Sequence, residues 1–84
     1  MRVEWSETAR EELAEIWIKA DSGHRRAVTA AADLIDKRLH SNPEDESESR
    51  ENDQRVLFEA PLGIRFQIQV KPAVVRVVKV WQFR

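Results

Sequence analysis

The chain has 84 residues, of which 42% are hydrophobic and 35% are charged, and its formal net charge is −1. This size and composition predict one globular domain over residues 1–84 rather than a disordered segment or several domains. The chain has no cysteine and two histidines, so disulfides are excluded and we expect neither a metal nor a cofactor. No apolar run matches a membrane span or a signal peptide, so we expect a cytoplasmic protein that does not contact the membrane.

The first half of the chain predicts a short strand and then two helices. Residues 2–5 favour a strand, and Ser6 can cap a helix whose apolar residues recur with helical spacing. These residues are Ala9, Leu13, Ile16, Trp17 and Ala20. Residues 21–23 separate this helix from a second one over 24–40, whose alanine-rich first half lets the two pack closely as an antiparallel hairpin. Two tryptophans are expected in the core: Trp5 and Trp17.

Charge is distributed unevenly after the second helix. Residues 43–54 hold six acids and one arginine, a formal charge of −5, which leaves +4 for the rest of the chain. Such a run is typical of a solvated loop, although it could also lie on basic residues of the same chain or repel nucleic acid. We therefore predict an acidic loop over 43–54.

The second half predicts three antiparallel strands, because the hydrophobic period changes from 3.6 to 2. The strands cover 55–60, 64–70 and 74–83, with turns at 61–63 and 71–73. The middle strand alternates apolar and polar residues throughout. The expected fold is α+β in the order β-α-α-β-β-β, with the helical hairpin packed on one face of an antiparallel sheet.

A strand register follows if one face of this sheet stays apolar. The register pairs Phe58 with Phe66 and Phe66 with Val80, and it places Glu59 beside Arg65. The predicted inner face, toward the helices, contains Val56, Phe58, Ile64, Phe66, Ile68, Val78 and Val80. The predicted outer face contains Arg55, Leu57, Glu59, Arg65, Gln67, Gln69, Lys79, Trp81 and Phe83.

Four segments form an ordered set along the chain. They are the first helix, Trp5-Ser6-Glu7-Thr8-Ala9-Arg10-Glu11-Glu12-Leu13 followed by Glu15-Ile16-Trp17, the helix end Arg38-Leu39-His40-Ser41-Asn42-Pro43, the strand entry Pro61-Leu62-Gly63-Ile64-Arg65-Phe66 and the closing strand Val77-Val78-Lys79-Val80. In this order they resemble the RelE/ParE superfamily of toxins over nearly the whole chain. The resemblance implies a prokaryotic, cytoplasmic toxin that inhibits growth and is neutralised by a cognate antitoxin. RelE-like members cut messenger RNA on the ribosome, whereas ParE-like members inhibit DNA gyrase.

The resemblance also implies a candidate catalytic pair. Arg65 matches the family's central-strand arginine, and Lys79 is the nearby replacement cation for RNA cleavage. Val56 and Phe58 stand where family lysines lie, and the chain has no tyrosine. ParE-like inhibition is therefore favoured, with a ribonuclease and a non-toxic binding module of the same fold as alternatives. Each residue also has an explanation that involves no catalysis: Arg65 could form a salt bridge with Glu59, and Lys79 could simply be solvated.

Apolar side chains near the end of the chain predict a surface that a partner covers. The candidate partner-binding residues are Leu57, Trp81, Phe83 and Arg84. The antitoxin is the favoured cover, and a homodimer partner or the chain's own acidic loop is the alternative. The resemblance implies the ribosome with its mRNA, or DNA gyrase, as the target.

Overall fold

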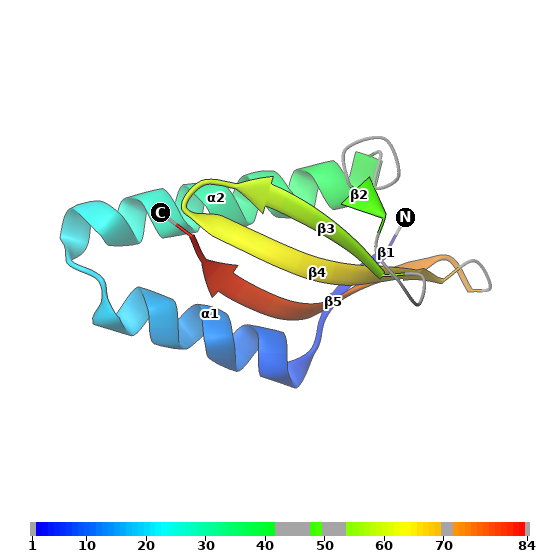
Figure 1. Cartoon of the computed structure of the whole chain (residues 1–84), viewed down its shortest axis with the longest axis horizontal. Helices are drawn as coiled ribbons and strands as arrows, with labels where there is room; N and C mark the ends of the chain where they lie inside the picture. The colour runs from blue at the N-terminus through cyan, green and yellow to red at the C-terminus, as the bar shows by residue number, and fades with distance from the viewer. Residues whose placement is uncertain (1, 42–47, 50–53, 70–71, 84) are drawn as a thin grey trace.

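Two helices pack on one face of a single sheet in the computed structural model, which describes residues 2–41, 48–49, 54–69 and 72–83 (Figure 1). The elements are β1 Arg2–Trp5, α1 Glu7–Lys19, α2 Ser22–Ser41, β2 Glu48–Ser49, β3 Gln54–Glu59, β4 Leu62–Gln69 and β5 Val74–Gln82. Within these residues the sheet has the strand order β1-β5-β4-β3-β2. α1 packs on β5, and α2 packs on β1, β3 and β4. The predicted α+β fold, with a helical hairpin on one face of a sheet, is confirmed.

The sheet is mixed rather than purely antiparallel. β1 runs parallel to β5, from Arg2 opposite Val74 to Trp5 opposite Val77, while the other neighbouring strands are antiparallel. The antiparallel prediction was wrong for β1, because its partner is the last strand of the chain and no local turn encodes the direction of so distant a pairing. β1 therefore forms one edge of the sheet.

A short strand lies at the opposite edge. β2 (Glu48–Ser49) pairs with β3 through Glu48 opposite Val56 and Ser49 opposite Arg55. These two residues belong to the segment that was predicted to be an acidic loop, so that prediction was wrong for them, as it was for Gln54, the first residue of β3. The rest of the predicted loop, up to residue 53, lies outside the described residues.

Each helix begins where a side-chain oxygen caps it. Ser6 Oγ accepts a hydrogen bond from the Ala9 backbone N–H at 3.0 Å, and Asp21 Oδ1 accepts one from the His24 backbone N–H at 2.8 Å. Both caps satisfy amides that the first turn of a helix leaves without an internal partner. α2 consequently begins at Ser22, two residues before the predicted start.

The core lies between the hairpin and the inner face of the sheet. Its largest fully buried side chains are Phe66, Ile35, Leu39, Leu62, Ile64, Val28, Val75 and Val77. Trp5 packs against this cluster, as expected. Trp17 does not: it is 42% exposed on the outer side of the hairpin, where its indole donates to Thr29 Oγ1 at 3.3 Å. Trp17 lies at the edge of the apolar stripe of α1, so its side chain contacts α2 instead of packing in the core.

The pairing of β3 with β4 differs from the predicted register by an odd number of residues. Leu57 pairs with Ile64 and Phe58 pairs with Gly63, around a two-residue connection at Ala60 and Pro61. An odd shift turns every side chain of the strand to the other face. Leu57 is therefore buried at 3% exposure and Phe58 is 43% exposed, the reverse of the prediction. Three consecutive residues of β3 are apolar, so the alternation of apolar and polar residues did not show which of them face the core.

The pairing of β4 with β5 contains an irregularity that the sequence did not reveal. Arg65 pairs with Lys79, but the next residue, Phe66, pairs with Val77, so Val78 is an extra residue in β5. Such a β-bulge changes which residues of the strand point inward on either side of it. The predicted opposition of Phe66 and Val80 was therefore wrong, because Val80 lies opposite Ile64.

Candidate functional site

The outer face of the sheet, which points away from the helices, places Arg65 of β4 directly opposite Lys79 of β5. Both side chains are exposed. Two like charges directly opposite each other on a sheet destabilise the pairing. The structure thus brings the two candidate catalytic residues together, and their repulsion lowers the stability of the sheet. An anionic ligand at this position could contact both side chains.

Only one member of this pair has a carboxylate beside it among the described residues. Lys79 Nζ lies 3.2 Å from Glu12 Oε2 of α1, and Glu12 Oε1 accepts a hydrogen bond from the Val80 backbone N–H at 3.0 Å. Glu12 therefore holds α1 against the end of β5 and partly neutralises Lys79. It was missed in the sequence because its spacing is that of an ordinary polar position on an amphipathic helix.

Arg65 makes no ion pair within the described part of the chain. The predicted partner, Glu59, points to the other face, where its Oε2 lies 3.1 Å from Arg38 Nη1 of α2. The predicted Arg65–Glu59 salt bridge was wrong for the same reason as the β3 register. Arg65 thus keeps an exposed positive charge that no described carboxylate offsets.

Phe58, Trp81 and Phe83 form an aromatic cluster on the same face of the sheet. Trp81 lies two residues after Lys79 in β5, and Gly63, which pairs with both Phe58 and Trp81, lies two residues before Arg65 in β4. Phe58 meets Trp81 edge to face with ring centroids 6.0 Å apart, and it meets Phe83 in the same way at 5.2 Å. Trp81 lies over Gly63, where an added Cβ would come within 2.6 Å of the indole. Phe58 and Phe83 remain 43% and 41% exposed. The cluster is an apolar surface with fixed geometry beside a positive charge.

The structure brings together only part of the predicted partner-binding set. Trp81 and Phe83 lie in the aromatic cluster, and the Phe83 backbone N–H donates to the Pro61 carbonyl oxygen at 3.0 Å. Leu57 is a core residue, so its assignment to the exposed surface was wrong, and Phe58 is the exposed residue that packs beside Trp81 and Phe83. Arg84 lies outside the described residues.

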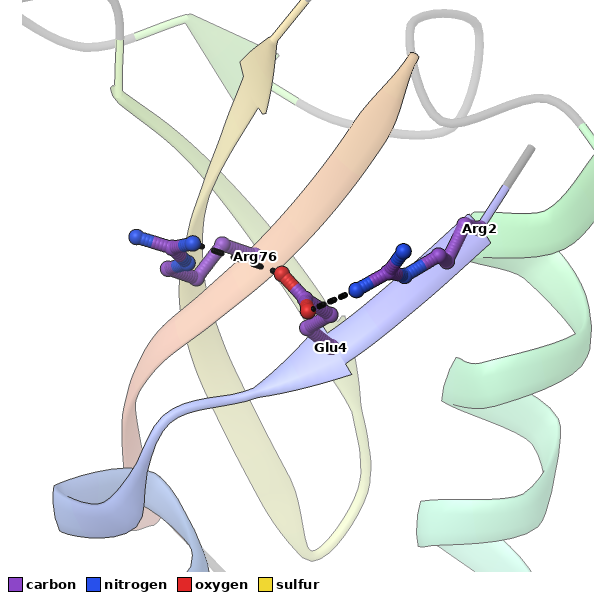
Figure 2. A network of polar contacts seen from close by, with 3 residues as sticks. All are labelled: Arg2, Glu4 and Arg76. Atoms are coloured by element: carbon purple, nitrogen blue, oxygen red, sulfur yellow. Dashed lines mark hydrogen bonds and ion pairs between the residues drawn. The ribbon is translucent and has the colours of Figure 1, made fainter. Parts of the chain in front are cut away.

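A second group of charges lies on the same outer face at the β1 edge (Figure 2). The Glu4 carboxylate receives Arg2 on one oxygen and Arg76 on the other, the latter at 3.3 Å. The hydrogen bond from Arg2, and then that from Arg76, hold the pKa of Glu4 below its usual range. Two arginines around one carboxylate leave this end of the face positive as well.

Neither histidine of the chain lies on the outer face of the sheet. His24 and His40 both lie on α2. His40 Nδ1 is 3.4 Å from Asp36 Oδ2 of the same helix, whereas His24 lines a cleft that also contains Glu12 and Trp81. Within the described residues no group of three or more histidines, aspartates and glutamates could hold a metal ion. No helix in that part is long and apolar enough to cross a membrane.

Trp81 also borders a cleft at the edge of the sheet. The cleft has a volume of about 420 Å³ and is lined by side chains of α1, α2 and β5 that include Glu12, Glu15, Lys19 and His24. The cleft adjoins Lys79, because Glu12 both lines the cleft and forms the ion pair with Lys79. An occupant of the outer face could therefore reach both the cation pair and this cleft.

Comparison with known proteins shows a likeness in structure. The sequence matches no protein-family profile and no curated protein. The toxin–antitoxin complex RelBE2 from Mycobacterium tuberculosis superposes with a TM-score of 0.78 at 15% identity, covering 96% of this chain and 95% of that one. The chromosomal ParDE system from P. aeruginosa gives 0.76 at 15% identity, covering 100% and 97%. The E. coli RelBE complex gives 0.65 at 19% identity, covering 96% and 94%.

The likeness extends over almost the whole length of both chains in each comparison, so it concerns the complete arrangement of hairpin and sheet. It includes both RelE-type and ParE-type structures, and at these identities it does not separate them. The chain therefore has the RelE/ParE fold.

Proposed function

We propose that this chain is the toxin of a type II toxin–antitoxin pair, and that it acts in the cytoplasm by binding its target in the ParE manner. An antitoxin would neutralise it by covering the outer face of the sheet. The observation that carries this proposal is the Arg65–Lys79 pair, two like charges held side by side on an exposed face. A sheet gains nothing from this pair by itself. A partner that brings carboxylates or phosphates to the face would remove the repulsion.

The aromatic cluster supports the same surface. Exposed aromatic rings beside arginine are the residue types that dominate protein–protein interfaces. Phe58 and Phe83 are both well exposed, and they pack on Trp81, which follows Lys79 by two residues in β5. An antitoxin segment that carries apolar side chains for the cluster and acids for Arg65 would fit the face in both shape and charge.

Binding without cleavage is favoured because neither a tyrosine nor a histidine lies beside Arg65 and Lys79 on the described outer face. Cleavage of RNA needs a group that takes a proton from the 2′-hydroxyl and one that gives a proton to the leaving oxygen. The chain has no tyrosine, and its two histidines lie on α2. Glu12 is engaged with Val80 and Lys79.

A RelE-like ribonuclease is the second candidate, and one observation favours it. Because Glu59 pairs with Arg38, Arg65 is free of the acid that the sequence placed beside it. An unneutralised arginine next to a lysine can stabilise the charge that develops on a phosphate during cleavage. A binding module without toxicity is the third candidate.

Expression in bacteria tests the class of protein. We expect growth arrest when the chain is produced alone and recovery when the cognate antitoxin is produced with it. An Arg65→Ala variant should lose the arrest, whereas Gln67→Ala, on the same face of β4, should keep it. A chain that accumulates in folded form without slowing growth would indicate the non-toxic binding module.

Two assays with purified protein separate the target classes. We expect inhibition of DNA gyrase supercoiling and no cleavage of messenger RNA on translating ribosomes. Cleavage that disappears in Arg65→Ala would reject the ParE-like proposal in favour of the ribonuclease. Growth arrest with neither activity would point to another target and reject gyrase.

A further inference from the structure

The outer side of the helical hairpin, opposite the sheet, carries an apolar groove that is open in the described structure. The groove has a volume of about 470 Å³, and its lining residues include Leu13, Ala14, Trp17, Ile18 and Val28. It shares Trp17, Thr29 and Asp33 with a second groove of about 500 Å³ further along α2. Trp17 and Ile18 are 42% and 65% exposed. A continuous apolar surface of this kind marks a contact with another macromolecule.

Two opposite charges along this surface of α2 are placed symmetrically. Arg26 and Asp33 are seven residues apart, which is about two helical turns or 10.5 Å along the axis and places them on the same side of the helix. Both are exposed, and neither has an ion pair or side-chain hydrogen bond with a described residue. Arg25 differs, because its guanidinium donates to the carbonyl oxygens of Trp17 and Ile18 at 2.9 and 3.0 Å. Arg26 and Asp33 thus carry opposite charges and are equidistant along α2 from a point between Thr29 and Ala30.

We infer that this surface binds a second copy of the chain, with the two α2 helices antiparallel across a two-fold axis between Thr29 and Ala30. A two-fold axis at that point sets Arg26 of each copy opposite Asp33 of the other. One symmetry operation therefore forms two ion pairs from four charges that are unpaired in the described part of the single chain. A partner of a different sequence would need its own matching charges, whereas a second copy supplies them by symmetry.

The side chains near the axis fit this arrangement. Thr29 and Ala30 are small and exposed, so two helices can approach closely where they cross. The Trp17 indole is hydrogen-bonded to Thr29 Oγ1 and therefore lies beside the axis. Dimerisation would bury the indoles of both copies, and buried tryptophans at the centre of an interface contribute strongly to affinity. The surface lies on the opposite side of the helices from the sheet, so the dimer leaves the outer face of the sheet open, and the inference stands apart from the proposed function.

Charge reversal tests this symmetry directly. The molar mass of the purified chain is measured by light scattering over a range of concentrations, for the original chain, Arg26→Asp and Asp33→Arg. We expect the original chain to approach twice its mass of 9.8 kDa as concentration rises. Each single variant should dimerise at least about 10-fold more weakly, because two attractions become two repulsions. An equimolar mixture of the two variants should recover the dimer, because both acids of one copy would then face both arginines of the other.

Matched variants separate this interface from a general charge effect. Glu11→Arg changes the net charge by the same amount as Asp33→Arg, at an exposed residue of α1 that lines neither groove, and should dimerise as the original chain does. If a single variant fails to fold, the double variant Arg26→Asp, Asp33→Arg carries both changes in one chain; it restores both ion pairs between the two copies and should dimerise. A monomeric original chain, single variants that dimerise unchanged, or a mixture that stays monomeric would each overturn the inference.

Discussion

At the scale of single residues, the position of Trp81 depends on the smallest side chain in the sheet. Gly63 lies directly opposite Trp81, and the indole occupies the space that any Cβ at this position would need. No glycine in the described residues has a positive φ, so the requirement at residue 63 is for space and not for an unusual backbone. This close packing holds the indole against β4, where it forms one side of the aromatic cluster.

A methyl group at residue 63 should therefore displace the indole. We expect Gly63→Ala to lower the free energy of unfolding by about 1–3 kcal/mol, as overpacking usually does. Urea denaturation measures this change. Gly23→Ala is the matched control, because its Cβ would meet only Asp21 Oδ1 at 3.7 Å and alanine is favoured over glycine in a helix. If Gly63→Ala were as stable as this control, the close packing of Trp81 on Gly63 would be wrong.

The network around Glu4 should make stability depend on pH (Figure 2). Its two arginine partners lower the pKa of Glu4 in the folded chain below the usual value of 4.5. A lowered folded pKa means that the stabilising contribution is complete above pH 4.5 and is lost as the pH falls through the folded pKa. The difference in unfolding free energy between the original chain and Glu4→Gln should therefore be constant near neutral pH and shrink below pH 4.5. A difference that grew on acidification would contradict the assignment.

At the scale of elements, the sequence predicted best where local alternation was unambiguous. β4 alternates so regularly that its inner residues Ile64 and Phe66 and its outer residue Arg65 were predicted correctly. β3 offered Val56, Leu57 and Phe58 in succession, so its orientation depended on the turn. The turn lies at Ala60 and Pro61, one residue earlier than predicted, and the resulting shift exchanged the two faces.

The candidate site shows the same limits. Arg65 could be placed on the outer face because β4 alternates, and Lys79 because the pairing that keeps the inner face apolar puts it on the outer face. Their direct opposition could not be predicted, because it depends on the bulge at Val78, which moves β5 by one residue. Glu12 could not be predicted either, since its contact joins α1 to the far end of the chain.

Two adjacent residues of β3 provide a direct check of its orientation. Leu57→Ala should lower the free energy of unfolding by about 2–5 kcal/mol, because it opens a cavity in the core. Phe58→Ala should cost less, about 0.5–1.5 kcal/mol, because it removes edge-to-face contacts on a half-exposed ring. Urea denaturation of both variants measures the difference. The predicted register would require the opposite order.

At the scale of the whole molecule, the helices cover one face of the sheet and leave the other to solvent. A domain of this size buries a modest share of its surface, and its stability is correspondingly small. The open face nevertheless holds a like-charged pair, Arg65 and Lys79, and exposed rings, Phe58 and Phe83. Features that lower stability and solubility on one face are expected where that face serves a partner or target.

This arrangement predicts that stability and function oppose each other at Arg65. Replacing Arg65 by threonine removes the repulsion with Lys79 and introduces a residue that suits strands, so the free energy of unfolding should rise by about 0.2–1 kcal/mol. The same variant should lose growth arrest, because the exposed cation is part of the proposed binding face. Gln67→Thr, on the same face of β4 opposite Arg76, accounts for the effect of threonine alone and should keep the arrest. A less stable Arg65→Thr chain would mean that Arg65 serves the fold, in which case its exposure would no longer argue for a role in binding.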